Sequence, residues 1–380
     1  EATAALAILG GQSDKEVLLE LKNLLQVHNP INRCAYDDWS ESDASPCHWE
    51  GVGCDATGHV DVLDLSSSNI SSLCYGKFSR LTHLDLSANS ITGELGDDLK
   101  RCQSLRYLNL SNNLIGGILD VSGLANLHTL DVSQNRFQHT ISVNFPAICS
   151  NLTFFSVASN NLTGRIDGLL DRCSKLRNVD LSRNSFSGTL WPGVSRLSRF
   201  SANDNKLTGF VSSGVFATGC RLQYLNIASN YLHGNFPSSI ANCTGPIPKE
   251  IGNCTSLLWL NIAGNRLSGG IPPEMAPKNC RAIWSRLAMG YDPLPVSSPL
   301  RTALGYVQLS GNLLSGEIPS SIGRMRSISL LLLADNGLSG SLPSEIVQLN
   351  LVSLDVSNND ISGEVPDNGR IRMSSRRVVV

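Results

Sequence analysis

A six-residue pattern, leucine–any–leucine–any–any–asparagine, recurs along most of this chain and limits its possible folds more than any other feature. Copies occupy Leu84–Asn89, Leu108–Asn113, Leu130–Asn135, Phe155–Asn160, Val179–Asn184, Phe200–Asn205, Leu225–Asn230, Leu260–Asn265, Val307–Asn312, Leu331–Asn336 and Leu354–Asn359. From Asn89 to Asn230 successive asparagines are 24, 22, 25, 24, 21 and 25 residues apart. A period of this length predicts a solenoid, in which each repeat forms one coil and stacks on its neighbours.

The residue types explain how such coils would stack. In a short strand alternate side chains point to opposite faces, so both leucines of the pattern point inward. The asparagine stands where the chain leaves the strand, and its amide can satisfy backbone groups of the neighbouring coil. We therefore expect an asparagine ladder beside a parallel sheet. An earlier copy, Leu63–Ser68, has serine at the asparagine position.

Two further features accompany the repeat. The sequence leucine–any–glycine–any–isoleucine or leucine–proline follows several asparagines, as in Leu267–Pro272, Leu314–Pro319 and Leu338–Pro343. Near the N-terminus, Ser13–Glu16 has the form of a capping box before a helix from Val17 to Leu25. Trp39 and the segment Cys47–Cys54 come next, and a first coil needs such a cap because it has no upstream neighbour.

Together these motifs resemble the plant-specific leucine-rich-repeat class of receptor-like kinases, receptor-like proteins and polygalacturonase inhibitors. The resemblance implies an α/β solenoid, wound as a right-handed superhelix with a parallel concave β-sheet, an N-terminal helical cap and a non-repeat island. Cys47 and Cys54 match the plant cap, and we expect them to form a disulfide rather than a metal site, because no His and Cys partners cluster with them.

Two longer spacings interrupt the repeat and set the predicted domain boundaries. Asn230 and Asn265 are 35 residues apart, which predicts a kink, a partial coil or a gap at the Cys243/Gly245 junction. Asn265 and Asn312 are 47 residues apart, and the excess either carries a binding surface or is a tolerated loop. The predicted organisation is a cap (1–57), repeats (58–273, with an incomplete coil near 237–256), an island (274–304), repeats (305–367) and an irregular tail (368–380).

Three segments narrow the resemblance. They are Gly164–Asp167 with Asp171–Cys173, Ile251–Trp259 and Cys280–Trp284. They resemble a nematode-induced group of plant leucine-rich-repeat receptor-like kinases, related to the brassinosteroid and phytosulfokine receptors. This resemblance implies a cell-surface immune receptor that perceives a small nematode-derived molecule and recruits a shorter leucine-rich-repeat co-receptor kinase. The chain departs from that group in its missing middle repeats, its shorter island and its lack of a transmembrane helix and kinase, as expected of a fragment or a truncated gene product.

The outward position before the first leucine of each strand is the candidate binding column. It reads His83, Tyr107, Thr129, Phe154, Asn178, Arg199, Tyr224, Trp259 and Tyr306. Five of these nine residues are aromatic although aromatic residues are only 6% of the chain, and exposed aromatic rings offer large contact area at low entropic cost. The alternative is that the rings merely cover the sheet. The predicted ligand contacts are Trp259, Tyr306, Tyr224, Arg199, Phe154 and Tyr107, with Cys280, Trp284 and Tyr291 of the island.

The next outward column holds polar residues such as Asp85, Asn109 and Asp180, which could contact a ligand or simply be solvated.

Cysteines and glycosylation sequons predict the secretory route. The chain has 11 cysteines, and sequons begin at Asn69, Asn109, Asn151, Asn161, Asn242 and Asn253. Because Cys102, Cys149, Cys173 and Cys254 each lie three residues before a repeat leucine, we expect them to be small buried apolar residues. We therefore expect the chain in the apoplast, secreted or at the extracellular face of the plasma membrane.

Charge and motifs exclude several functions. A net charge of −2 favours neither nucleic acid nor anionic lipid, and the sequence has no apolar run long enough to span a membrane. No metal-ligand spacing, phosphate-binding loop, kinase catalytic loop or nucleophile elbow occurs, so we expect no enzyme activity, metal or cofactor in this chain. The leading function is a receptor ectodomain for a small molecule or peptide. The alternatives are a secreted inhibitor or receptor-like protein that binds a microbial protein, and a truncated non-functional paralogue.

Overall fold

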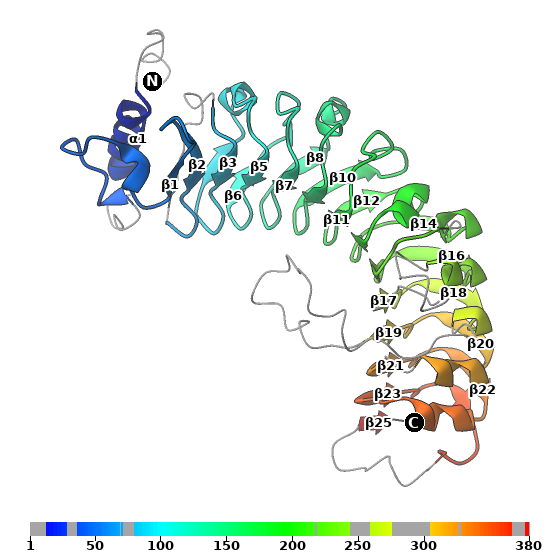
Figure 1. Cartoon of the computed structure of the whole chain (residues 1–380). Coiled ribbons are helices and arrows are strands. Elements are labelled where there is room, and N and C mark those ends of the chain that lie inside the picture. The colour runs from blue at the N-terminus through cyan, green and yellow to red at the C-terminus, as the bar shows by residue number, and fades with distance from the viewer. Residues whose placement is uncertain are drawn as a thin grey trace. The chain divides into compact units, whose positions relative to one another are not determined.

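A computed structural model describes residues 13–28, 36–68, 70, 80–216, 219–243, 259–275, 305–325, 328–366 and 377–379. It divides into two compact units, each a stack of coils (Figure 1). Unit 1 is Glu1–Leu162 with Arg172–Lys175, and unit 2 is Thr163–Asp171 with Leu176–Val380. The island residues from 276 to 304 lie outside the described residues, as does the stretch from 244 to 258.

The cap of unit 1 begins with helix α1 (Asp14–His28). Its first turn is closed by the predicted capping box: the Ser13 backbone N–H donates to Glu16 Oε2 at 2.8 Å, and the Glu16 N–H donates to Ser13 Oγ at 3.3 Å. Asp14 then ties the helix to the first coil, because its Oδ2 accepts the Val60 N–H at 2.9 Å. The helix therefore covers the open end of the solenoid.

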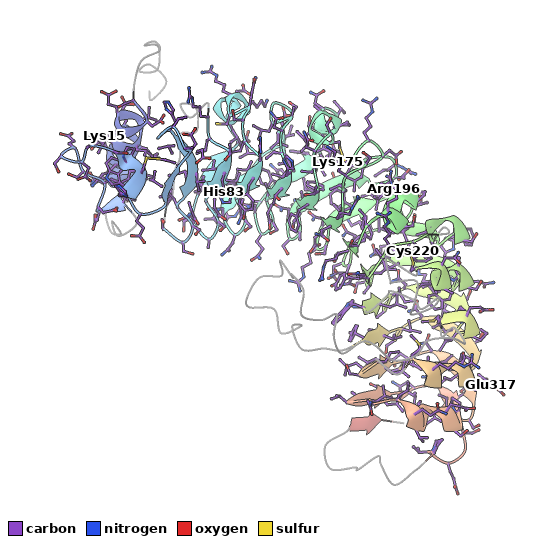
Figure 2. All side chains as sticks on the ribbon, viewed as in Figure 1. Lys15, His83, Lys175, Arg196, Cys220 and Glu317 are labelled. Carbon is purple, nitrogen blue, oxygen red and sulfur yellow. A yellow bond between two sulfur atoms is a disulfide. The ribbon has the colours of Figure 1, made fainter. Side chains whose placement is uncertain are left out.

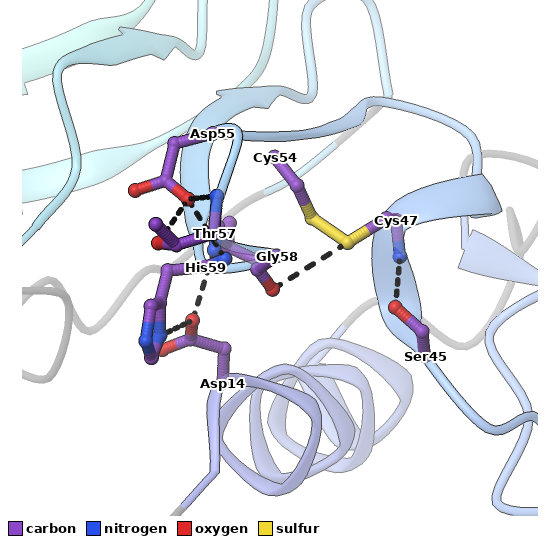
Figure 3. The surroundings of a disulfide bond; sticks show 9 residues. Asp14, Ser45, Cys47, Cys54, Asp55, Thr57, Gly58 and His59 are labelled. Atoms are coloured by element: carbon purple, nitrogen blue, oxygen red, sulfur yellow. Dashed lines mark hydrogen bonds and ion pairs between the residues drawn. A yellow bond between two sulfur atoms is a disulfide. The ribbon is translucent and has the colours of Figure 1, made fainter.

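Aromatic rings and a disulfide complete this cap. Trp39 and Trp49 stack with ring centroids 5.6 Å apart, and both rings are buried. Cys47 and Cys54, the pair expected from the sequence, form a disulfide between the turn η2 (Pro46–His48) and strand β1 (Val52–Cys54). Figure 3 shows this disulfide with the hydrogen bonds around it. The bonded sulfurs hold the turn against the first strand of the sheet.

The main sheet of unit 1 is formed by the repeated leucine pattern. Its strands are β1, β2 (Val60–Asp64), β3 (His83–Asp85), β5 (Tyr107–Asn109), β7 (Thr129–Asp131) and β9 (Phe154–Ser156). β1 and β2 are antiparallel, and the later neighbours are parallel. Leu84, Leu108 and Leu130 are register partners and are all buried. The stacked coils thus share one leucine interior, which confirms the predicted solenoid.

The main sheet of unit 2 continues the same pattern. Its strands are β11 (Asn178–Asp180), β13 (Arg199–Ser201), β15 (Tyr224–Asn226), β17 (Trp259–Asn261), β19 (Tyr306–Gln308), β21 (Leu330–Leu332), β23 (Ser353–Asp355) and β25 (Arg377–Val379). β15 pairs directly with β17, and β17 directly with β19, despite the two long spacings in the sequence. The sheet therefore keeps its register across both interruptions.

A ladder of asparagines joins each coil to the next. Asn113 Oδ1 accepts the Ile91 N–H at 3.0 Å, and its Nδ2 donates to the Leu86 carbonyl of the preceding coil at 2.8 Å and to Leu110 at 3.0 Å. The same bonds recur at Asn89, Asn135, Asn160, Asn205, Asn230, Asn265, Asn312, Asn336 and Asn359. The amide satisfies buried backbone groups that no strand partner reaches, as the sequence predicted.

Short strands after the ladder form secondary sheets on another side of the coils. They are β4 (Thr92–Glu94), β6 (Leu114–Gly116), β8 (Gln138–Thr140), β10 (Asn161–Arg165), β12 (Ser185–Ser187), β14 (Thr208–Phe210), β16 (Tyr231–Asn235), β18 (Arg266–Gly269), β20 (Leu313–Glu317), β22 (Gly337–Gly340) and β24 (Asp360–Ile361). In unit 2, one parallel sheet is formed by β14, β16, β18, β20, β22 and β24, and we call it the flank sheet. Figure 1 shows it on the side of unit 2 opposite β17 to β23.

Single turns of 3-10 helix close the coils. They are η3 (Asp97–Arg101), η4 (Phe145–Ile148), η5 (Pro192–Arg196), η6 (Ser213–Phe216), η7 (Ser238–Asn242), η9 (Pro273–Met275), η12 (Ser320–Arg324) and η13 (Ser344–Gln348). Buried residues in these turns, such as Ile148, Val194 and Ile240, extend the leucine interior.

The cysteines in these coils correct one prediction. Cys149 and Cys173 are buried, as expected, but they form a disulfide, with Cα atoms 4.3 Å apart. Cys220 and Cys243 form another, with Cα atoms 4.2 Å apart. A cysteine at the same position in adjacent coils faces its counterpart because parallel coils stack in register, so two buried thiols are brought within bonding reach. Cys102 is buried as predicted, and Cys254 lies outside the described residues.

The end of the chain differs from the irregular tail expected for 368–380. Arg377–Val379 form β25, which pairs in parallel with β23, placing Val378 beside Leu354. The backbone of a sheet edge offers unpaired N–H and C=O groups to any nearby extended segment. This strand carries no copy of the repeat, so the sequence pattern did not predict it.

Candidate ligand-binding surface

The candidate column of unit 2 lies on the main sheet, at the first residue of each strand. Arg199, Tyr224, Trp259 and Tyr306 are consecutive register partners from β13 to β19. Each side chain points away from the leucine interior, because the next residue of its strand is buried. The solenoid therefore places four predicted contact residues in one row, although they span more than a hundred positions in the sequence.

These four side chains, which we call the aromatic stack, contact one another face to face. The Arg199 guanidinium carbon lies 4.6 Å from the Tyr224 ring centroid. The Tyr224 and Trp259 centroids are 5.6 Å apart with planes 16° from parallel, and those of Trp259 and Tyr306 are 3.9 Å apart at 17°. All four side chains are half-buried. Stacking fixes their orientation in advance, so a ligand would not have to immobilise them.

The indole N–H of Trp259 has no hydrogen-bond acceptor among the described residues. The Nε1 atom of this indole is buried. Most buried polar groups in native proteins are hydrogen-bonded, and an exception calls for a physical explanation. An acceptor supplied from outside the described coils would satisfy this donor.

The two tyrosines of the stack remain protonated well above neutral pH. Burial raises the pKa of Tyr224, and the negative charge of Asp180 raises it further. Burial also raises the pKa of Tyr306. Both hydroxyls are therefore neutral at the pH of any extracellular fluid and can donate a hydrogen bond.

The second outward column has a local role that the sequence did not reveal. In it the side-chain oxygen accepts the backbone N–H two residues later, which closes a turn at the end of the strand. These residues are Asp64, Asp85, Asn109, Asp131, Asp180, Asn226, Asn261, Gln308 and Asp355. Burial raises the pKa of Asp180, and its bonds with Ser182 and the charge of Arg199 oppose that shift. The side chains of this column therefore stabilise the ends of the strands, independently of any contact with a ligand.

Unit 1 holds the other predicted contacts of the main sheet. His83, labelled in Figure 2, stacks on Tyr107 with ring centroids 3.9 Å apart. The Tyr107 hydroxyl donates to Asp85 Oδ2 at 3.2 Å, and burial with this carboxylate raises the pKa of Tyr107 to about 12. Phe154 is half-buried at the start of β9. Tyr107 is thus already engaged within the fold, unlike the Trp259 indole.

The remaining predicted site residues fall into two groups. Cys280, Trp284, Tyr291, Asn69 and Asn253 lie outside the described residues. Among the other sequon asparagines, Asn161 and Asn242 are exposed, Asn151 is half-buried, and Asn109 donates to Asp85 Oδ2 at 2.9 Å.

The described residues hold neither a metal-binding cluster nor a helix that could span a membrane. No cluster of His, Cys, Asp and Glu within them could hold a metal ion. Within the same residues, α1 and the short turns include no helix long and apolar enough to cross a bilayer.

Comparison with protein-family models now identifies the repeats. The leucine-rich-repeat N-terminal domain matches residues 12–55, and leucine-rich-repeat models match 58–115, 175–197, 221–243, 256–277, 303–325 and 350–369. Together these matches cover more than half of the chain.

The chain belongs to the leucine-rich-repeat family.

Its curated relatives include plant receptor kinases with leucine-rich repeats. A probable leucine-rich-repeat receptor-like serine/threonine-protein kinase of Arabidopsis thaliana is 39% identical over 246 residues, covering 63% of this chain and 22% of that protein. The brassinosteroid receptor kinase BRL3 of Oryza sativa subsp. japonica is 30% identical over 309 residues, covering 71% of this chain and 22% of that protein. This leucine-rich-repeat chain therefore spans about a fifth of the length of these relatives.

Solved structures share the fold. A structure of PEPR1–AtPEP1 superimposes with a TM-score of 0.63 at 24% identity, covering 96% of this chain and 58% of that one. A plant ice-binding protein superimposes with a TM-score of 0.54 at 22% identity, covering 96% and 91%. Since leucine-rich-repeat proteins of such different description share these coils, function has to be argued from the surface residues.

Proposed function

We propose that this chain is the extracellular ligand-binding part of a plant receptor-like kinase, and that it binds a peptide or small molecule on the aromatic stack. The observation that carries the proposal is the buried, unmatched Trp259 indole N–H at the centre of four pre-stacked side chains. Similarity to plant receptor kinases supports the same class of function.

The stack has the physical properties of a binding hot spot. Aromatic and arginine side chains dominate the energy of recognition because they bury large area from few rotatable bonds. Here Arg199 provides a cation, Tyr224 and Tyr306 provide neutral hydroxyls, and Trp259 provides a desolvated donor. A ligand with a flat apolar face and an acceptor near its centre would complement this row. Nothing in this mechanism requires catalysis, a metal or a cofactor.

Two narrower elements of the proposal rest on family resemblance. We infer that the ligand-loaded chain recruits a shorter leucine-rich-repeat co-receptor kinase and that the receptor acts in immune perception. A nematode-derived ligand is the narrowest form of this hypothesis. We also propose that Cys280, Trp284 and Tyr291 contact the ligand, since the island lies between Trp259 and Tyr306 in the sequence.

Ligand capture tests the proposal. The immobilised chain is incubated with plant extracellular fluid, and retained compounds are identified by mass spectrometry. Wild type should retain a compound that the Trp259→Ala/Tyr306→Ala variant loses, because two hot-spot residues contribute about 2 kcal/mol or more, about thirtyfold in affinity. Thr129→Ala, at the same strand position without an aromatic ring, is the control and should retain it.

Two outcomes would contradict the proposal. Equal retention by wild type and the double variant would exclude the stack as the site. Inhibition of a microbial polygalacturonase by the chain, undiminished in the double variant, would favour the secreted-inhibitor alternative. Circular dichroism of each variant shows whether the coils remain folded.

A further inference from the structure

The flank sheet of unit 2 carries exposed aromatic residues that the aromatic stack does not use. Phe210 on β14 is 67% exposed and Tyr231 on β16 is 48% exposed. Most large apolar side chains of the described coils are buried, so two exposed rings on adjacent strands form an unusual feature. They lie on a different sheet from Trp259 and Tyr306.

Strand register groups these rings with basic side chains. Phe210, His233 and Arg266 are direct partners across β14, β16 and β18. The Phe210 and His233 ring centroids are 4.6 Å apart, and the Arg266 guanidinium carbon lies 5.7 Å from the Tyr231 ring centroid. All four side chains are exposed. We call Phe210, Tyr231, His233 and Arg266 the flank patch.

The Phe210 ring of the patch packs against the backbone although it faces solvent. A Cβ added at Gly234 would lie 2.3 Å from the Phe210 ring, so the ring rests directly on this glycine, whose φ is +87°. A side chain at this position would displace the ring. This contact restricts the orientation of the Phe210 ring, which lowers the entropic cost of using the ring in binding.

Basic side chains lie in and beside the patch. Arg266 belongs to it, and Lys206 is exposed two outward positions before Phe210. Glu317 of β20, labelled in Figure 2, leans toward the next strand, since a Cβ on Gly340 would lie 2.8 Å from its Cγ. The patch thus combines flat aromatic faces with cations and suits an anionic ligand.

The spacing of the rings indicates the class of ligand. A protein interface needs a contiguous, desolvated apolar centre, whereas polar Thr208, His233 and Ser268 separate the apolar groups here. A sugar ring offers a small apolar C–H face to one aromatic ring and its polar groups to the surroundings. A carboxylate on that sugar can pair with guanidinium.

We propose that the flank patch binds a carboxylated polysaccharide, with the sugar rings stacked on Phe210 and Tyr231 and a uronate carboxylate paired with Arg266. This site is independent of the aromatic stack. Its occupant would lie along the flank sheet, across strands about 5 Å apart.

Calorimetric titration of the whole chain with oligogalacturonate tests the proposal, with a neutral malto-oligosaccharide of the same length as ligand control. Wild type should bind the former and not the latter. Phe210→Ala/Tyr231→Ala should weaken binding about tenfold or more, and Arg266→Gln by a similar factor. Arg136→Gln and Leu114→Ala follow ladder asparagines as Arg266 and Tyr231 do, lie in unit 1 and should leave affinity unchanged.

Several results would overturn the inference. Absence of oligogalacturonate binding would do so. An affinity of Phe210→Ala/Tyr231→Ala within about twofold of the wild-type affinity would also do so, because it would indicate diffuse charge attraction. Equal loss in Arg136→Gln would also show non-specific attraction. Polyglutamate bound as tightly, with the same dependence on Phe210 and Tyr231, would assign the patch to an acidic protein. Trp259→Ala/Tyr306→Ala should bind oligogalacturonate normally, so failure of either proposal leaves the other testable.

Discussion

Replacing Asn113 with alanine should destabilise the solenoid far more than the small loss of side-chain volume suggests. The Asn113 amide is buried and bonds four backbone groups in two neighbouring coils. Alanine leaves the Ile91 N–H without its only acceptor seen among the described residues. The carbonyls of Leu86, Leu110 and Ser111 each lose one donor but keep another. The remaining donors are the side-chain amides of Asn89 and Asn135 and the backbone N–H of Ala88.

The magnitude follows from this difference between the N–H and the carbonyls. An orphaned buried N–H costs about 1–3 kcal/mol, and each of the two N–H bonds that the amide supplies to the carbonyls has a net contribution of about 0.5–1 kcal/mol. The expected loss is therefore about 2–5 kcal/mol. Asn126→Ala is the matched control, because this exposed asparagine makes one bond, to the Gln103 carbonyl at 2.9 Å, and should cost about 1 kcal/mol or less.

Hydrogen exchange is the appropriate assay, because repeat proteins open locally and need not unfold in one step. Asn113→Ala should accelerate exchange at the Ile91 amide, together with a lower thermal midpoint. Asn126→Ala should leave Ile91 protected. If Asn113→Ala leaves both the midpoint and the Ile91 protection at wild-type values, the ladder does not stabilise the stack and the reasoning fails.

Three further predictions follow from individual contacts. Cys149→Ser/Cys173→Ser should lower stability by about 3 kcal/mol under non-reducing conditions, as expected for a closed loop of this length, and an unchanged thermal midpoint would show that the bond is dispensable. Tyr107 should titrate near pH 12 rather than 10. Because the folded state retains this proton, the contribution of Tyr107 to the free energy of unfolding is complete below pH 10 and is lost as pH rises toward 12. Tyr107→Phe should remove that loss when unfolding is measured as a function of pH, and a pH profile identical to that of wild type would contradict the prediction. Exposed Asn161 should carry a glycan when the chain is secreted from plant cells, and peptide mass spectrometry that finds it unmodified would refute this.

Much of the fold could be predicted because the repeat fixes both burial and register. Once Leu84, Leu108 and Leu130 share an interior, the residues before them must line up on the opposite face. The column that contains Trp259 and Tyr306 was visible for that reason. The ladder asparagines were predictable because one side-chain amide can accept a hydrogen bond and donate two at a single buried point.

Other features could not be read from the pattern, since they depend on what stacking brings together. Cys149 and Cys173 are each compatible with a buried apolar position, and only their approach across adjacent coils makes a disulfide. The engagement of Tyr107 by Asp85 depends on diagonal geometry between strands. The flank patch was missed because Phe210 and Arg266 are 56 residues apart and meet only through strand register.

The claim that ligand lies on the aromatic stack is tested most directly by hydroxyl-radical footprinting of the whole chain, with and without the compound retained in the capture experiment. The account predicts slower oxidation at Tyr224, Trp259 and Tyr306 when the compound is bound, with Tyr231 on the flank sheet unaffected. Unchanged oxidation at all three stack residues, with protection at any other surface, would contradict it.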